Sequence, residues 1–176
     1  MAQKKSMAEL ERLSPTEYAT APKIPVSLVL DDIRSANNVG SMFRTADCLA
    51  IEHVYLCGIT ATPPHRDILK TALGASASVA WSYHDNATEL IQELKAKGIK
   101  TFAVEQTHGS IQLRQFRAEG HSPLAIVLGN EVQGVQQSII DNCDGCLEIE
   151  QFGTKHSFNV AIAAGLVLYE LSGQLR

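Results

Sequence analysis

The chain has 176 residues and a mass of 19.1 kDa, which is the size of one domain. Hydrophobic residues make up 45% of it and aromatic residues only 6%, so a full but mainly aliphatic core is predicted. The net charge of −4 and the pI of about 5.8 argue against a general nucleic-acid coat, although local basic contacts stay open. The candidates for such contacts are Lys4, Lys5, Arg12, Lys23, Arg34, Arg66, Lys70 and Lys155.

The start of the chain is polar and carries no targeting signal that we can identify. MAQKKSMAELERL lacks the apolar centre of a secretory signal, and no later run reaches the ~18–20 apolar residues of a membrane span. We therefore expect a cytoplasmic protein with no membrane partner. Residues 1–23 are predicted to be an N-terminal extension with a short helix near Ser6 to Leu13, and residues 24–176 are predicted to be the domain itself.

Two of the four cysteines form the pattern Cys143-Asp144-Gly145-Cys146. A structural zinc site needs a second pair of ligands, and none is suitably spaced. A redox pair of the thioredoxin type would place its first cysteine at a helix start, whereas this pair lies between a helix end and a strand start. We therefore predict reduced thiols and no metal.

Apolar strands alternate with helices along the rest of the chain. This alternation favours an α/β fold with a parallel sheet and helices on both faces. The predicted strands are Val26–Leu30, His53–Cys57, one around Val79–Tyr83, Thr101–Glu105, Leu124–Leu128 and Cys146–Glu150. The predicted helices are Asn38–Ala50, Arg66–Leu73 with Gly74 as its C-cap, Ala87–Lys97, Gln136–Asn142 and Ser157–Leu171. Residues 107–120 are expected to be irregular.

Polar loops that contain glycine follow three of these strands, after Leu30, Leu128 and Glu150. Ligands of open α/β sheets bind at the carboxyl ends of strands, so we expect these loops to share a site. The chain lacks G-x-G-x-x-G after its first strand, and GNEVQG lacks the Lys-Ser/Thr of a P-loop, which argues against a common NAD or ATP site.

The start of the last helix contains two polar residues. Ser157 is a natural N-cap, because its hydroxyl accepts an orphan backbone N–H. Asn159 falls in the first turn, where asparagine is a poor helix former. Either both residues cap a frayed start or they point at something outside the helix.

Three segments resemble the three motifs of the SpoU (TrmH-like) RNA ribose 2′-O-methyltransferases, in the SPOUT superfamily. They are NVGSMFRTA from Asn38, VLGNEVQG from Val127 and GTKHSFNVA from Gly153, in the order of the family. The resemblance implies a parallel-sheet α/β fold with a C-terminal deep trefoil knot, which general topology rules would not predict. It also implies S-adenosylmethionine as cofactor, an RNA substrate with tRNA favoured over rRNA, and a homodimer.

The resemblance also implies roles for particular residues. Backbone groups that hold the cofactor map onto Leu128, Gly129, Asn130, Ile149 and Phe158. The reactive centre maps onto Asn38, Arg44, Glu131, Ser157 and Asn159.

Arg44 would complete the site of the partner subunit. A guanidinium cannot easily take a proton, so we expect Arg44 to hold a phosphate bidentately while phosphate or water accepts the proton. Asn38 is expected either to orient Arg44 or the ribose, or to be a helix N-cap. Glu131 is expected to pair with an arginine or to cap the following segment.

The chain departs from the family pattern in two places. Glu150 stands where the third motif usually has proline, and we expect residues 1–23 to be too short for the N-terminal RNA-binding domain of many relatives. Target choice would then fall to residues 1–23, the Arg66–Gly74 segment, the dimer surface or a partner protein. A catalytically silent RNA-binding or assembly factor on the same fold, and a small-molecule methyltransferase, are the competing hypotheses; the complete set of five reactive-centre residues argues against the first.

Overall fold

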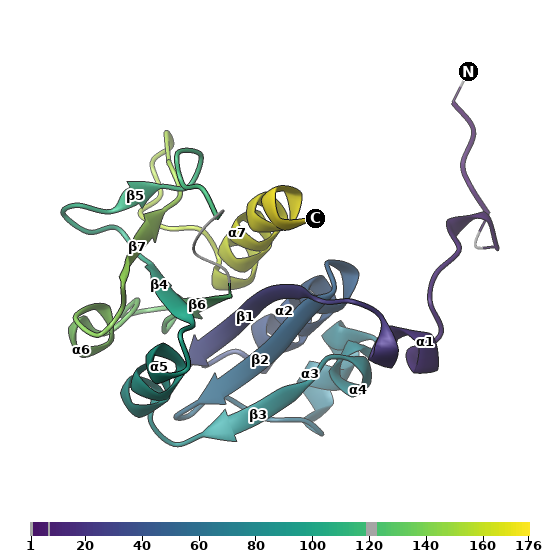
Figure 1. Ribbon diagram of the computed structural model, residues 1–176, viewed down its shortest axis with the longest axis horizontal. Helices are drawn as coiled ribbons and strands as arrows, with labels where there is room; N and C mark the ends of the chain where they lie inside the picture. The colour runs from purple at the N-terminus through teal and green to yellow at the C-terminus, as the bar shows by residue number, and fades with distance from the viewer. Residues whose placement is uncertain (1, 7, 119–122) are drawn as a thin grey trace.

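The structure is a computed structural model that describes residues 2–6, 8–118 and 123–176. A seven-stranded sheet in the order β3-β2-β1-β6-β4-β7-β5 forms its centre (Figure 1). All the strand pairs of this sheet are parallel, which confirms the predicted fold class. The strands are β1 (Ile24–Asp31), β2 (Ile51–Cys57), β3 (Trp81–His84), β4 (Lys100–Val104), β5 (Ile111–Gln112), β6 (Leu124–Leu128) and β7 (Gly145–Glu148).

Helices cover both faces of the sheet. One layer contains α2 (Ala36–Cys48), α3 (Arg66–Ala72), α4 (Ala75–Ser78) and α7 (Val160–Leu175). The other layer contains α5 (Ala87–Ala96) and α6 (Gln137–Ile140). Two N-terminal elements, the 3₁₀ turn η1 (Ala8–Leu10) and α1 (Pro15–Thr20), precede the sheet, and residues before α1 extend away from the body of the domain (Figure 1). No helix in the described ranges is long and apolar enough to cross a membrane.

The central strands supply both layers with core side chains, because successive residues of a strand point to opposite faces. In β1, Leu28 and Leu30 belong to the core cluster that contains Phe43 of α2. Val29 belongs to the cluster on the other face, with Ile91 of α5. Burial on both faces explains why β1 and β6 are almost continuously apolar in the sequence.

The start of α2 is held in place by its close approach to α3 at Gly40. A Cβ atom at Gly40 would meet Thr71 Oγ1 at 2.1 Å and Ile68 O at 2.4 Å, so only glycine allows this packing. Thr71 Oγ1 also donates a hydrogen bond to Asn37 O (3.0 Å). These contacts fix the N-terminal turn of α2 at the carboxyl edge of the sheet.

The helix that was predicted in the N-terminal extension, near Ser6 to Leu13, does not form there. Only the turn η1 forms within the Ser6–Leu13 range, of which Met7 lies outside the described residues. The helix α1 begins instead at Pro15, because Ser14 and Glu17 form a capping box: Ser14 Oγ accepts from Glu17 N (3.3 Å), and Glu17 Oε2 accepts from Ser14 N (2.8 Å). Serine, proline and glutamate at these spacings are a helix-start signal that the sequence contained.

Other element boundaries also differ from the prediction. The strand β5 lies within the range 107–120 that was expected to be irregular, of which residues 119 and 120 are outside the described part. The C-cap of α3 is Leu73 in the left-handed conformation (φ 50°), and Gly74 is instead the N-cap of the unpredicted α4. The strand β7 ends at Glu148, two residues earlier than expected.

Candidate functional site

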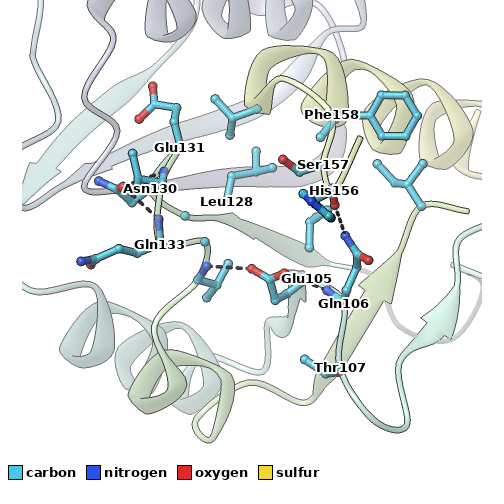
Figure 2. A pocket seen from close by; sticks show the side chains of 18 of the residues that line it. Glu105, Gln106, Thr107, Leu128, Asn130, Glu131, Gln133, His156, Ser157 and Phe158 are labelled. Carbon is cyan, nitrogen blue, oxygen red and sulfur yellow. Dashed lines mark hydrogen bonds between the residues drawn. The ribbon is translucent and has the colours of Figure 1, made fainter. Parts of the chain in front are cut away.

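A cavity of about 710 Å³ lies where β4, β6 and β7 reach the carboxyl edge of the sheet (Figure 2). Its walls are the residues that end β4, the loop after β6, and the segment between β7 and α7. They comprise Val104, Glu105, Gln106, Thr107, residues 128–135, Gln137, Ile140, Leu147, Ile149, Gln151, residues 156–160 and Ala163. The loops after Leu128 and Glu150 therefore converge as predicted, whereas the wall from β4 was not predicted.

The loop after β1 joins this cavity through the carboxylate of Glu131. Glu131 Oε2 accepts a hydrogen bond from Arg34 N (2.8 Å), and Oε1 accepts from Ser35 N (3.0 Å) and from Asn38 Nδ2 (2.9 Å). Glu131 thus binds the backbone of Arg34 and not its guanidinium, so the predicted pairing with an arginine side chain was wrong. The N-cap of α2 is Ser35, whose hydroxyl accepts from Asn38 N (3.3 Å), so Asn38 is not a cap.

The third motif connects to the same group of residues through Asn159. Its Nδ2 donates to Asn38 Oδ1 (3.2 Å), and its Oδ1 accepts from the N–H groups of Ala161 (2.9 Å) and Ile162 (3.4 Å). Asn159 is therefore the N-cap of α7, so of the two residues considered as caps Asn159 is the one that caps the helix, and the helix begins at Val160 and not at Ser157 as predicted. Glu131, Asn38 and Asn159 form one hydrogen-bonded chain across all three motifs.

The electrostatics of this chain favour an ionised Glu131. Partial burial by itself would raise the pKa of Glu131, but the hydrogen bonds from Arg34, Asn38 and Ser35 outweigh it, and the pKa is lowered from its usual value. The charge also lies next to the N-terminus of α2, where the helix dipole favours an anion.

The loop after β6 is anchored at both ends. Asn130 Nδ2 donates to Asp32 O (2.8 Å), while Asn130 Oδ1 accepts from Val132 N (2.9 Å). At the other end, Glu105 Oε2 accepts from Val135 N (2.9 Å). Gly134 has a φ of +70°, and a Cβ there would meet Glu105 Oε2 at 2.2 Å, so glycine is required for this approach.

Glu105 and Gln106 are site residues that the sequence reasoning missed. Gln106 Nε2 donates to His156 O (2.7 Å) and so connects the end of β4 to the third motif (Figure 2). The signal was available, because Glu105 and Gln106 follow a buried strand, and parallel strands end at the same edge of a sheet. The loop that they begin lacks the family motifs that marked the other three loops.

The predicted site residues fall into two groups. All of the predicted cofactor-binding residues line the cavity, namely Leu128, Gly129, Asn130, Ile149 and Phe158. Glu131, Ser157 and Asn159 line it as well, and Asn38 is bound to two of them. Arg44 is exposed on α2 and is not among the lining residues. The chemical roles of these side chains stay predictions.

Two carboxylates lie side by side beneath the first loop. Asp31 is 4% exposed, and Gln136 Nε2 donates to both Asp31 Oδ2 and Asp32 Oδ2 at 3.3 Å. Burial and the neighbouring charge of Asp32 raise the pKa of Asp31 to about 6, against the smaller opposite effect of Gln136. In the described ranges, no three His, Cys, Asp or Glu side chains are grouped so that they could hold a metal ion.

Comparison with known proteins places this geometry in a family. The model of the "SpoU rRNA Methylase family" matches residues 25–169. The chain is 30% identical to the 23S rRNA (guanosine(2553)-2′-O)-methyltransferase RlmP of Bacillus subtilis over 157 residues, which is 89% of this chain and 60% of that protein. The chain spans about three fifths of the length of the curated relatives that it matches.

Solved structures share the fold. The AdoMet-bound rRNA methyltransferase from Sinorhizobium meliloti superposes with a TM-score of 0.81 at 25% identity, over 94% of this chain and 62% of that one. The A. aeolicus TrmH/SpoU tRNA modifying enzyme also gives a TM-score of 0.81, over 91% of this chain and 80% of that one; at 24% identity it shows the fold alone.

The raised pKa of Asp31 predicts how stability depends on pH. The folded-state pKa of about 6 lies above the ordinary value of 3.8, so ionised Asp31 destabilises the fold, and stability is gained as the pH falls from about 6 to about 4. Asp31→Asn should be insensitive to this titration. The unfolding free energies of the two proteins, measured by urea denaturation from pH 7 to pH 4, should therefore change relative to each other by up to about 3 kcal/mol. Parallel curves would show that Asp31 titrates normally.

Proposed function

Because the chain belongs to the SpoU rRNA Methylase family, we propose that it transfers a methyl group from S-adenosylmethionine to a ribose 2′-OH of RNA. The observation that carries this proposal is the hydrogen-bonded chain of Glu131, Asn38 and Asn159, which joins the three family motifs at one cavity. This chain of hydrogen bonds brings the three family motifs together beside the cavity.

The cavity suits S-adenosylmethionine in size and chemistry. Its volume of about 710 Å³ falls in the range of small-molecule sites. Leu128, Leu147, Ile149 and Ala163 supply apolar surface for an adenine ring, while the carboxylate of Glu105 and the amide groups of the surrounding loops supply partners for hydroxyl and amino groups. When bound, the cofactor supplies a methyl group that its sulfonium already activates.

The protein's own task is then to align the ribose. A reacting hydroxyl must be held at roughly 3–3.5 Å from the methyl carbon. Ser157 and Asn159 lie in the wall of the cavity next to Phe158, and Asn38 is bound to Asn159. We expect these polar groups to position the 2′-OH and Arg44 to hold the adjacent phosphate, which leaves phosphate or water to accept the proton.

We propose that Arg44 reaches the cavity of a partner subunit in a homodimer. Arg44 follows Asn38 by six residues, so it lies about 9 Å further along the axis of α2. The helix α7, which packs against α2, exposes an apolar stripe of Ile162, Leu166 and Tyr169 at helical spacing. An exposed stripe of this kind, on a helix that packs against the helix of Arg44, supports an interface at which each subunit supplies its arginine to the other.

The proposed fold includes the deep trefoil knot of the family. After β7 the chain passes back beyond β4 and β6 in the sheet order, and α7 packs against α2 and β1. The segment between β4 and β6 contacts both ends of this crossing: Gln106 Nε2 donates to His156 O, and Gln174 Oε1 accepts from Ala118 N (2.8 Å). Contacts at both ends support a threaded path.

The nature of the RNA is open to direct test. Names of relatives include both rRNA and tRNA enzymes, so the preference for tRNA stays a prediction, as does the cytoplasmic location.

Purified protein should transfer tritium from methyl-labelled S-adenosylmethionine to bulk RNA of cells that lack the gene. After digestion to nucleosides, the label should appear as 2′-O-methylribose. Arg44→Ala should lower kcat about 100-fold, and Arg44→Lys should recover little of it, because an ammonium cannot grip a phosphate bidentately. Lys97→Ala, which changes an exposed cation beside α5, is the matched control and should leave the rate unchanged. Cofactor binding without transfer to any RNA would instead favour the silent RNA-binding factor.

Mixing inactive variants tests whether the site is shared. Arg44→Ala and Asn38→Ala should each be nearly inactive, because one loses the donated guanidinium and the other the receiving site. In an equimolar mixture that has exchanged subunits, half of the twofold dimers are hybrids with one complete site, so about a quarter of the wild-type rate should return. A mixture as inactive as its components would show that Arg44 acts within its own subunit or not at all.

A further inference from the structure

The segment between β7 and α7 carries an aromatic side chain at the edge of the cavity. Gln151 lines the cavity, and the chain returns to its wall at His156. Between them, Phe152, Gly153, Thr154 and Lys155 are exposed. Phe152 is 87% exposed, the largest value among the big apolar side chains of the described residues. We call residues 152–155 the rim segment.

Single exposed apolar residues are common, so exposure alone does not indicate a ligand. The position of Phe152 is what distinguishes it. It is one residue from a lining residue of the proposed reaction cavity, and in the loop after β6 Val132 lines the cavity while being 72% exposed. Both segments therefore leave a large apolar side chain open to solvent, although full burial of a phenylalanine side chain would gain about 1.5–3 kcal/mol.

The charges of the rim segment favour a polyanion. Lys155 is exposed and forms no hydrogen bond or ion pair with any described residue. Glu150, which precedes the segment, is paired with Arg114, with 3.5 Å between Arg114 Nε and Glu150 Oε2. The carboxylate that most closely precedes the segment in the sequence is thus offset by a cation, and Lys155 leaves the segment with a net positive charge in a chain whose overall charge is −4.

An exposed aromatic ring with an ammonium group three residues away fits one nucleotide. The ring offers a face on which a base can stack, a contact worth about 1–3 kcal/mol per base, and the ammonium attracts a phosphate. Bases inside a duplex are already stacked on their neighbours, so only an unpaired base can use the ring.

Building on the proposed function, we propose that Phe152 stacks on the base of an unpaired nucleotide next to the methylated ribose, with Lys155 at its phosphate. The target nucleotide therefore lies in a single-stranded loop, bulge or end of the RNA. Phe152 is a determinant of which RNA is accepted and does not take part in methyl transfer itself.

The test compares binding of a short, fluorescently labelled single-stranded RNA of mixed sequence with binding of the same RNA as a duplex, by anisotropy. Phe152→Ala should weaken single-strand binding about 5- to 100-fold and leave duplex binding unchanged. Phe152→Leu, which keeps the apolar surface but loses the ring, should fail in the same way. Phe152→Trp should stay within about threefold of the wild type, because it restores a ring. Affinity for S-adenosylhomocysteine should be the same in all four proteins.

Three results would overturn the proposal. The first is that Phe152→Leu binds single-stranded RNA as tightly as the wild type. The second is that Phe152→Ala changes the mass of the protein in solution, which would make Phe152 a subunit contact. The third is that the wild type binds the duplex as tightly as the single strand. Anisotropy measures stacking without any methyl transfer. If the wild type binds single strands through Phe152 but methylates no RNA, the methyltransferase proposal fails while the stacking proposal stands.

Discussion

The carboxylate of Glu131 is the interaction on which the candidate site depends. It receives the N–H groups of Arg34 and Ser35 and the amide of Asn38, and so fastens the loop after β6 to the start of α2. Asn38 in turn accepts from Asn159, the N-cap of α7. Hydrogen bonds to an ionised group are stronger than neutral ones, and an unmatched N–H or carboxylate here would be costly. The starts of both helices are therefore set by one charge.

This arrangement holds the three family motifs next to one another in space, although they are far apart in the sequence. The loops after β4, β6 and β7 shape the cavity. The loop after β1 is attached to it by hydrogen bonds to Glu131 and Asn130 of the loop after β6. A single chain then offers a cavity of about 710 Å³, but its own Arg44 lies outside the lining of that cavity. In the proposed function, the work is divided between this cavity, which holds the small methyl donor, and neighbouring surfaces, which select the RNA.

Periodicity in the sequence predicted the sheet and its two helical layers, because Leu124–Leu128 is apolar at every position and Val26–Leu30 at every position except Ser27, as expected for strands buried on both faces. The family motifs also led to Leu128, Gly129 and Ile149 at the cavity. Hydrogen-bond partners of side chains were harder to predict from the sequence. Asn38 bonds to residues 93 and 121 positions away. No local rule decides whether Ser157 or Asn159 caps α7, because the hydrogen bond from Asn159 to Asn38 helps to fix Asn159 in place.

Hydrogen exchange of the wild type and of Glu131→Gln, followed by mass spectrometry, tests the role of Glu131 most directly. If its charge holds the motifs together, the substitution should speed exchange in residues 32–38, 129–135 and 149–160 at once, while the core strands β1 and β2 keep their protection. Faster exchange confined to residues 129–135 would contradict this account, because the other two loops would then be held without Glu131.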